Sequence, residues 1–443
     1  MILLNVSTIT PDIPVWALVP FILMLLAIAV TPLVANHWWE HNKNKLIVSL
    51  VLGIPTAIYL MCNGLTHNLE HQLLYDYVPF IILLGALFTV TGGIHLKGDI
   101  KAKPWINTLF LGIGGVLASI MGTTGAAMLL IRPIITTNQQ RKYKVHTILF
   151  FIAVVANCGG LLTPLGDPPL FLLYLRGVDF SWFINLLPQW AMANGLLLFV
   201  FFICDSYFYK KEPTENIMSD KANVEPIKIV GGLNFVWLIG IVASVAFVTA
   251  KTFFDNPSES QNNYFKLIQS GVLVIMALLS LSFTKKVVRQ ANKFSWAPIT
   301  EVAFLFLGIF ITMVPALLYL SENAASFGLS HPWHFYYASG ALSSFLDNAP
   351  TAISFYELAG GVDFSHLGEY ILVGGIPEII MRAIAVGAVF FGSMTYIGNG
   401  PNFMVKAIAE ENKIAMPSFF GYMIKFSLIV LLPIYIIVQL CFL

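Results

Sequence analysis

The sequence predicts an all-α polytopic membrane protein with about ten transmembrane helices and two re-entrant hairpins, arranged as two inverted repeats. Three observations predict this fold: few charges, repeated apolar stretches, and two pairs of matching motifs. Charged residues make up 11% of the 443 residues and hydrophobic residues 57%, whereas an ordinary soluble domain is roughly 25% charged. Apolar stretches of about 20 residues can each cross a hydrocarbon layer of ~30 Å, so the composition favours a membrane protein.

The first predicted repeat covers residues 14–208. It contains three spans, a hairpin, a broken helix and a fourth span, at 14–35, 46–66, 77–96, 105–138, 145–177 and 184–208 respectively. The hairpin has two short apolar arms around a glycine-rich middle, Met121-Gly122-Thr123-Thr124-Gly125. Non-helical backbone at membrane depth is tolerated only where protein or a wet cavity surrounds it.

The second predicted repeat covers residues 229–441 and has the same order of elements. Its three spans, hairpin, broken helix and last span fall at 229–250, 264–284, 298–320, 333–360, 370–408 and 417–441. The hairpin turns at Leu346-Asp347-Asn348-Ala349-Pro350-Thr351. A polar cytoplasmic linker, 209–228, joins the two repeats.

Two ungapped alignments connect the repeats. Residues 115–126 align with 340–351, and residues 163–171 align with 395–403, at offsets of 225 and 232 residues. Each half has five crossings, an odd number, so the second half is inverted relative to the first. Inverted repeats place a binding site at their interface, near the midplane of the bilayer.

The placement of basic residues predicts the orientation. With the N-terminus outside, the inside loops carry 19 of the 24 Lys and Arg residues, whereas the outside loops carry Arg176, Lys251 and Lys266. This asymmetry satisfies the positive-inside rule. We expect both termini outside, in a bacterial inner (plasma) membrane crossed many times.

The two broken helices predict an ion site. Three prolines and a glycine within 163–169 remove backbone hydrogen bonds, and Gly398-Asn399-Gly400-Pro401-Asn402 has the same effect in the second half. The freed carbonyl groups, together with a carboxylate, suit a hard cation such as Na⁺. The exposed N–H groups of the next half-helix suit an anion.

Asp167 and Asp347 are the acids that we place deepest in the membrane. An intramembrane acid costs about 2.5–3.5 kcal/mol on insertion scales and is a functional-site hypothesis by default. Both are therefore candidate Na⁺ ligands. The alternative is that each carboxylate only caps the helix that follows it.

A different class, an intramembrane aspartyl protease, is suggested by Tyr75-Asp76 and Leu165-Gly166-Asp167. Pro164 stands where that class has glycine, and Asp76 is predicted to lie in the outside loop before the third span, away from Asp167. A channel or a non-transporting scaffold is a further alternative. Glu378 and Arg382 are spaced i, i+4 and are expected to pair.

The hairpin tips, together with Gly-Asp-Pro-Pro-Leu-Phe at 166–171 and Gly-Asn-Gly-Pro-Asn-Phe at 398–403, resemble the ion transporter superfamily, and most closely its NhaD-like sodium/proton antiporters with a citrate-transporter-like domain. The resemblance covers about 14–441 and implies two sodium sites with any anionic substrate between them. The first site would use Gly122, Thr123, Thr124, Gly166 and Asp167. The second would use Asp347, Asn348, Thr351, Thr395, Asn399 and Asn402.

The first hairpin tip departs from the family pattern, because Gly-Thr-Thr-Gly replaces the acidic Asp-Asn pair of the antiporters. The coupling stoichiometry and the substrate therefore stay open. The prediction is a secondary active transporter and not an enzyme, working as a Na⁺/H⁺ antiporter. The alternative is a Na⁺-coupled symporter of a small carboxylate, such as citrate or a dicarboxylate, or of an oxyanion.

We expect no cofactor, with Na⁺ as the transported or coupling ion. The expected partners are the lipid bilayer, Na⁺, and protons or a small anion, with no nucleic acid. A homodimer is the assembly that we consider.

Overall fold

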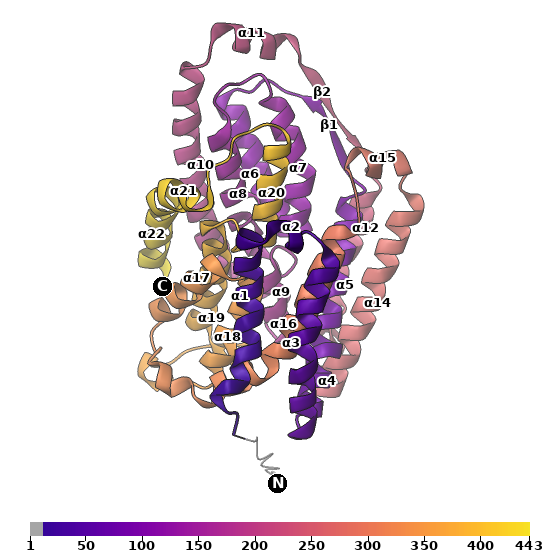
Figure 1. The fold of residues 1–443 in the computed structure, drawn as a ribbon, viewed down its shortest axis with the longest axis vertical. Coiled ribbons are helices and arrows are strands. Elements are labelled where there is room, and N and C mark those ends of the chain that lie inside the picture. The colour runs from indigo at the N-terminus through magenta and orange to yellow at the C-terminus, as the bar shows by residue number, and fades with distance from the viewer. Residues whose placement is uncertain (1–11) are drawn as a thin grey trace.

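The computed structural model describes residues 12–443, which form an elongated bundle of helices (Figure 1). Residues 14–210 contain the 3-10 helices η1, η3 and η4, the π-helix η2, ten α-helices and one strand. Their bounds are η1 Val15–Leu18, α1 Val19–Val34, α2 Asn36–Trp39, α3 Asn42–Cys62, α4 Thr66–His71, η2 Gln72–Tyr77, α5 Val78–Thr91, β1 His95–Asp99, α6 Pro104–Met121, α7 Thr123–Thr137, α8 Val145–Val154, η3 Cys158–Leu162, α9 Pro168–Leu175, η4 Phe180–Leu186 and α10 Leu187–Lys210.

The remaining residues repeat the pattern after a connecting segment. The bounds are α11 Thr214–Ala222, β2 Glu225–Val230, α12 Asn234–Phe247, α13 Ala250–Phe253, α14 Glu259–Phe283, α15 Lys286–Ala291, α16 Ala297–Glu322, η5 Ala324–Phe327, α17 Pro332–Phe345, α18 Asn348–Gly360, η6 Ser365–Leu367, β3 Leu372–Val373, β4 Ile376–Pro377, α19 Glu378–Phe391, η7 Gly392–Met394, α20 Gly400–Glu411, α21 Phe419–Tyr422, the π-helix η8 Met423–Leu431 and α22 Leu432–Phe442.

Within the described part of the chain, nine helices are long and apolar enough to cross a membrane. Eight coincide with predicted spans, and the ninth, Pro104–Met121, is the first arm of the first hairpin. The predicted span at 229–250 contains a shorter helix, α12, and the one at 370–408 is interrupted between α19 and α20. The predicted class, an all-α polytopic membrane protein, is confirmed.

Both predicted hairpins turn where the sequence indicates. Helices α6 and α7 meet at Gly122, whose φ of +80° lies in the left-handed region that favours glycine. Helices α17 and α18 meet at Leu346 and Asp347. The arms of each hairpin pack against each other.

Both predicted breaks are also present, with matching backbone geometry. Asp167 precedes α9 with φ −145° and ψ 143°, and Asn399 precedes α20 with φ −150° and ψ 138°. One hydrogen bond recurs at the aligned positions: Thr163 Oγ1 donates to the carbonyl of Ser119, and Thr395 Oγ1 donates to the carbonyl of Ser344. This recurrence supports the predicted repeat.

The half-helices pair across the two halves of the chain. Helix α9 packs against α18, and α7 packs against α20. In Figure 1 the α7–α20 pair lies toward the end that carries α11 and α15, whereas α9 and α18 lie toward the end that carries the N-terminus. Each pair therefore combines one helix from each half.

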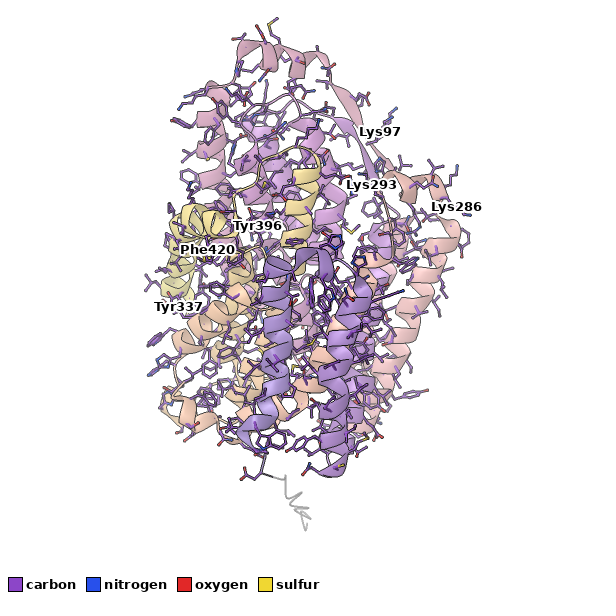
Figure 2. All side chains as sticks on the ribbon, viewed as in Figure 1. Lys97, Lys286, Lys293, Tyr337, Tyr396 and Phe420 are labelled. Atoms are coloured by element: carbon purple, nitrogen blue, oxygen red, sulfur yellow. The ribbon has the colours of Figure 1, made fainter. Side chains whose placement is uncertain are left out.

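The segment predicted as a polar linker, 209–228, contains regular secondary structure. It contains α11, and β2 pairs antiparallel with β1, with His95 opposite Val230. Figure 2 places Lys97, Lys286 and Lys293 toward this end of the molecule, as the predicted inside loops require. Which side of the membrane this end faces remains the prediction from charge.

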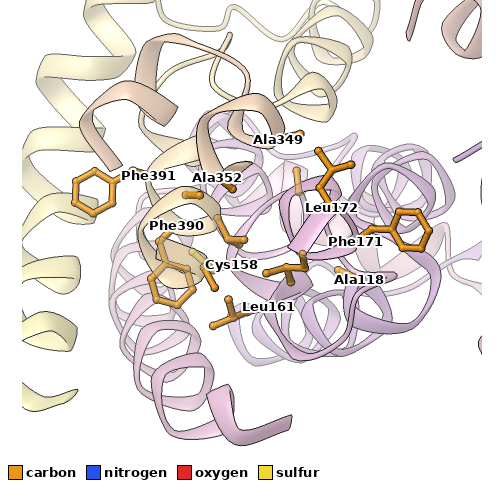
Figure 3. Packing of buried hydrophobic residues seen from close by; sticks show 14 of the residues in the cluster. Ala118, Cys158, Leu161, Phe171, Leu172, Ala349, Ala352, Phe390 and Phe391 are labelled. Carbon is orange, nitrogen blue, oxygen red and sulfur yellow. The ribbon is translucent and has the colours of Figure 1, made fainter. Parts of the chain in front are cut away.

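The buried core draws on both halves. Cys158 and Leu161 of η3, Phe171 and Leu172 of α9, and Phe390 of α19 pack together in Figure 3, and all are at most 2% exposed. The broken helices are therefore surrounded by apolar side chains, which exclude water and strengthen the polar contacts at the breaks.

The first break requires glycine at position 166. A Cβ atom added there would lie 1.9 Å from the carbonyl oxygen of Gly160, whereas one added at Gly195, within α10, meets nothing within 4 Å. We expect Gly166→Ala to lower the free energy of unfolding by about 1–3 kcal/mol, because a backbone clash forces the break to shift. Gly195→Ala is the matched control and should leave the melting temperature of the purified protein unchanged or raise it. Equal melting temperatures for the two variants would contradict this account of the break.

Candidate functional site

The carboxylate of Asp167 lies where both hairpin tips and both breaks meet. Asp167 is 1% exposed. Its Oδ1 accepts hydrogen bonds from Thr123 Oγ1 at 2.9 Å and Asn399 Nδ2 at 3.0 Å, and its Oδ2 accepts one from Asn348 Nδ2 at 2.6 Å. We call these four residues the Asp167 centre. One comes from each tip and one from each break, so the centre joins the two halves.

The local sequence explains why Asp167 faces the tips. Pro168 and Pro169 occupy the first two positions of α9 and have no N–H groups to donate. The Asp167 side chain accordingly makes no capping hydrogen bond to its own helix. In addition, the Thr123 N–H donates to the carbonyl of Gly166 at 2.7 Å, which fixes the first tip against the first break. The capping alternative therefore does not describe Asp167.

Asp347 behaves differently, because it caps α18. Its Oδ1 accepts a hydrogen bond from the Ala349 N–H at 3.0 Å, and Thr351 Oγ1 donates to its backbone carbonyl at 2.9 Å. The helix cap that the alternative predicts is therefore present at Asp347, and its role as a Na⁺ ligand stays a prediction. Asp347 nevertheless directly precedes Asn348, whose side chain contacts Asp167.

Asn157 is a residue of the site that the sequence analysis missed. Its Nδ2 donates to Asn402 Oδ1 at 2.7 Å, and its Oδ1 accepts from Asn399 Nδ2 at 3.2 Å. Asn402 in turn donates to the carbonyls of Gly392 and Thr395. A side chain from the first broken helix thus holds the second break. The available signal was a single amide within the otherwise apolar run 148–162.

The other predicted residues fall into two groups. Thr395 and Gly166 act at the breaks through the hydrogen bonds described above, and Gly122 provides the first turn. Thr124 is partly exposed, and no hydrogen bond connects its side chain to the described residues around it. The resemblance implied two separate sets of ligands, but Asn348 and Asn399 of the second set contact Asp167 of the first.

Among the described residues, the carboxyl group of the centre has no basic partner. Within residues 12–443, no salt bridge involves Asp167 or Asp347. Asn348 Oδ1 is also buried and accepts no hydrogen bond. Carboxylate and amide oxygens are ligands that hard cations prefer. Over the same residues, no group of three His, Cys, Asp or Glu side chains could hold a metal ion.

Asp76 corrects one prediction. It does not lie in an outside loop, because residues 66–91 are helical and Asp76 is buried within η2. Its carboxylate pairs with Arg176 at 3.3 Å and Lys266 at 3.6 Å. The partners of Asp167, by contrast, are amides and a hydroxyl, so the two acids do not form the carboxylate pair that a protease requires. The predicted Glu378–Arg382 pair is confirmed, at 2.8 Å.

A helical membrane protein with two broken helices and a buried charged centre between them belongs to the class of secondary transporters. A family described as "Putative citrate transport" matches residues 10–443, and the chain belongs to this family. A curated relative, the inner membrane protein YbiR of Escherichia coli (strain K12), is 23% identical over 348 residues, which are 75% of this chain and 80% of the relative. The family match agrees with the citrate-transporter-like resemblance that the motifs indicated.

Asn157 gives a test of how the two halves are held together. We expect Asn157→Ala to lower the free energy of unfolding by about 1–3 kcal/mol, because it removes the partner of two buried amides. Asn63→Ala is the control, since the Asn63 amide donates a hydrogen bond to the carbonyl of Tyr59 but is exposed. Thermal unfolding of the purified variants measures the difference, and a loss for Asn157→Ala no larger than that of the control would show that the link is unimportant.

Proposed function

We propose that the protein is a Na⁺/H⁺ antiporter of the bacterial inner membrane, with the Asp167 centre as the site where Na⁺ and H⁺ compete. The observation that supports this proposal most is that no basic side chain among residues 12–443 pairs with Asp167 or Asp347. An uncompensated carboxylate in a buried, water-poor site is costly. A cation taken from solution, either Na⁺ or H⁺, would remove that cost.

Competition at one carboxylate is sufficient for exchange. When Na⁺ is bound, the Asp167 carboxylate and Asn348 Oδ1 supply oxygen ligands. When a proton is bound, the carboxylic acid donates a hydrogen bond and no longer attracts a cation. Because the two ions exclude each other, each lowers the affinity for the other by the same factor. Alternating exposure of the site to the two sides then exchanges Na⁺ for H⁺.

The test uses proteoliposomes with a preset pH gradient and an internal pH dye. Addition of Na⁺ should collapse the gradient with the unmodified protein. Asp167→Asn should abolish the response, because an amide neither takes up a proton nor supplies a negative charge for Na⁺. Glu369→Gln, a change at an exposed acid, is the control and should respond like the unmodified protein. Failure of the unmodified protein to respond to Na⁺ or Li⁺ at every pH tested would refute the proposal.

Two observations favour a second candidate, a Na⁺-coupled symporter of a small carboxylate. The family description names citrate transport. In addition, four half-helices begin at the centre, α7 at Thr123, α9 at Pro168, α18 at Asn348 and α20 at Gly400. Helix N-termini attract anions, so a carboxylate substrate could lie between them, next to a bound Na⁺.

The two candidates predict different uptake. For the symporter, labelled citrate or dicarboxylate should accumulate in proteoliposomes only with an inward Na⁺ gradient, and Asp167→Asn should remove the dependence on Na⁺. For the antiporter, no labelled carboxylate should accumulate under the same conditions. Accumulation that is unaffected by the removal of Na⁺ would contradict both candidates.

A further inference from the structure

Helix α9 is flanked by Asp167 at its start and by Arg176 at its end. The Arg176 side chain pairs with Asp76 of η2 at 3.3 Å and with Glu357 of α18 at 3.3 Å. We call Arg176, Asp76 and Glu357 the outer clasp, because it lies toward the end predicted to face outside.

The outer clasp is connected to the Asp167 centre by two parallel helical paths. Arg176 follows Asp167 by nine residues, and Glu357 follows Asn348 by nine residues. Nine residues of helix span about 13 Å. Helices α9 and α18 pack against each other, touch at the centre through the Asn348–Asp167 hydrogen bond, and touch again at the clasp through the Arg176–Glu357 pair. The pair is therefore tied together at both ends and carries half of the centre.

The remaining member of the clasp ties this pair to a different part of the protein. Asp76 belongs to η2, which precedes α5, and Lys266 of α14 also contacts its carboxylate, at 3.6 Å. The η2 turn is π-helical, a rare form that is frequent at functional sites. It also provides Gln72, whose Oε1 accepts a hydrogen bond from Arg176 at 3.3 Å. Movement of the α9–α18 pair away from η2 would separate Arg176 from Asp76.

The opposite end of the molecule provides a comparison. There the α7–α20 pair ends at Glu411, which pairs with Lys293 at 2.5 Å. Lys293 and Glu411 are 60% and 55% exposed, whereas Arg176 and Asp76 are 18% and 4% exposed. An exposed ion pair contributes little, while the separation of a buried one leaves uncompensated charge. Of the two contacts, only the outer clasp is buried enough to restrain movement strongly.

Three features of the outer clasp favour its opening. Its ion pairs, both at 3.3 Å, are longer than the roughly 2.7–2.9 Å of a strong charge-assisted hydrogen bond. Arg176 contacts Oδ2 of Asp76 and Lys266 contacts Oδ1, so the two cations share one carboxylate charge. A cavity of about 370 Å³, lined by Gln72, Arg176, Glu259 and Glu357 among others, adjoins the clasp. The charges would therefore have other partners, or water, available when the contact breaks.

We propose that Arg176 is a positioning residue that holds the α9–α18 pair, and with it the Asp167 centre, against η2 through Asp76, and that opening of this contact limits the rate of the transport cycle. The statement about rate rests on the proposed function. The statement about restraint does not, because it concerns only the mobility of α9 and α18.

Three variants test the proposal in Na⁺-driven pH-gradient assays. Asp76→Asn removes the charge that holds Arg176 and should raise the maximal rate about threefold or more, with half-saturating Na⁺ changed by less than about twofold. Lys266→Met removes the second cation that shares the Asp76 carboxylate, so the Arg176–Asp76 contact tightens and the maximal rate should fall about threefold. Glu411→Gln, at the exposed contact, is the matched control and should behave like the unmodified protein. General damage to the fold would lower the rate of both test variants and could not produce the opposite directions.

Hydrogen–deuterium exchange gives a readout that does not depend on transport. Asp76→Asn should accelerate exchange in peptides covering 168–176 and 348–357, Lys266→Met should slow it, and Glu411→Gln should leave it unchanged. A maximal rate for Asp76→Asn that is equal to or below that of the unmodified protein, a change in half-saturating Na⁺ alone, or unchanged exchange would each overturn the proposal. If the unmodified protein shows no Na⁺ response, the proposed function fails and the exchange comparison alone decides whether the clasp restrains the pair.

Discussion

The structure depends on the hydrogen bonds that converge on one buried carboxylate. Asp167 takes donors from Thr123, Asn348 and Asn399, so four segments far apart in the sequence share a single acceptor group. Burying this charge is costly unless it is well hydrogen-bonded. The two breaks make this bonding possible. Each interrupts its helix at one polar residue, Asp167 or Asn399, and these two side chains meet.

The breaks could be predicted from the sequence, whereas the contacts between them could not. Proline and glycine act on the backbone directly, so both breaks and both tips could be located from 163–169, 398–402 and the aligned hairpins. Which tip contacts which break depends on packing between distant segments, and for that reason the sequence did not reveal the contact between Asn348 and Asp167. Asn157 was missed because one amide in an apolar run resembles ordinary packing. Asp76 was misplaced because the segment before the third span, expected to be a loop, continues the helix through a π-helical turn.

The two pairs of half-helices connect the Asp167 centre to the two ends of the molecule. The α9–α18 and α7–α20 pairs each combine one helix from each half, and each runs from the centre toward one end of the molecule (Figure 1). A change of ligand at Asp167 can therefore alter the contacts at the distant ends only by moving short, rigid helices. The ends differ in burial, so the two sides of the protein are not energetically equivalent, even though the sequence motifs that build them are matched.

The central claim is that Na⁺ and H⁺ compete for the Asp167 carboxylate. Calorimetric titration of the purified protein with Na⁺, repeated in buffers of different ionisation enthalpy, counts the protons released when Na⁺ binds. The account predicts proton release with the unmodified protein, without any added carboxylate, and neither binding nor release with Asp167→Asn. Binding of Na⁺ without proton release at any pH, or binding that requires citrate, would contradict it.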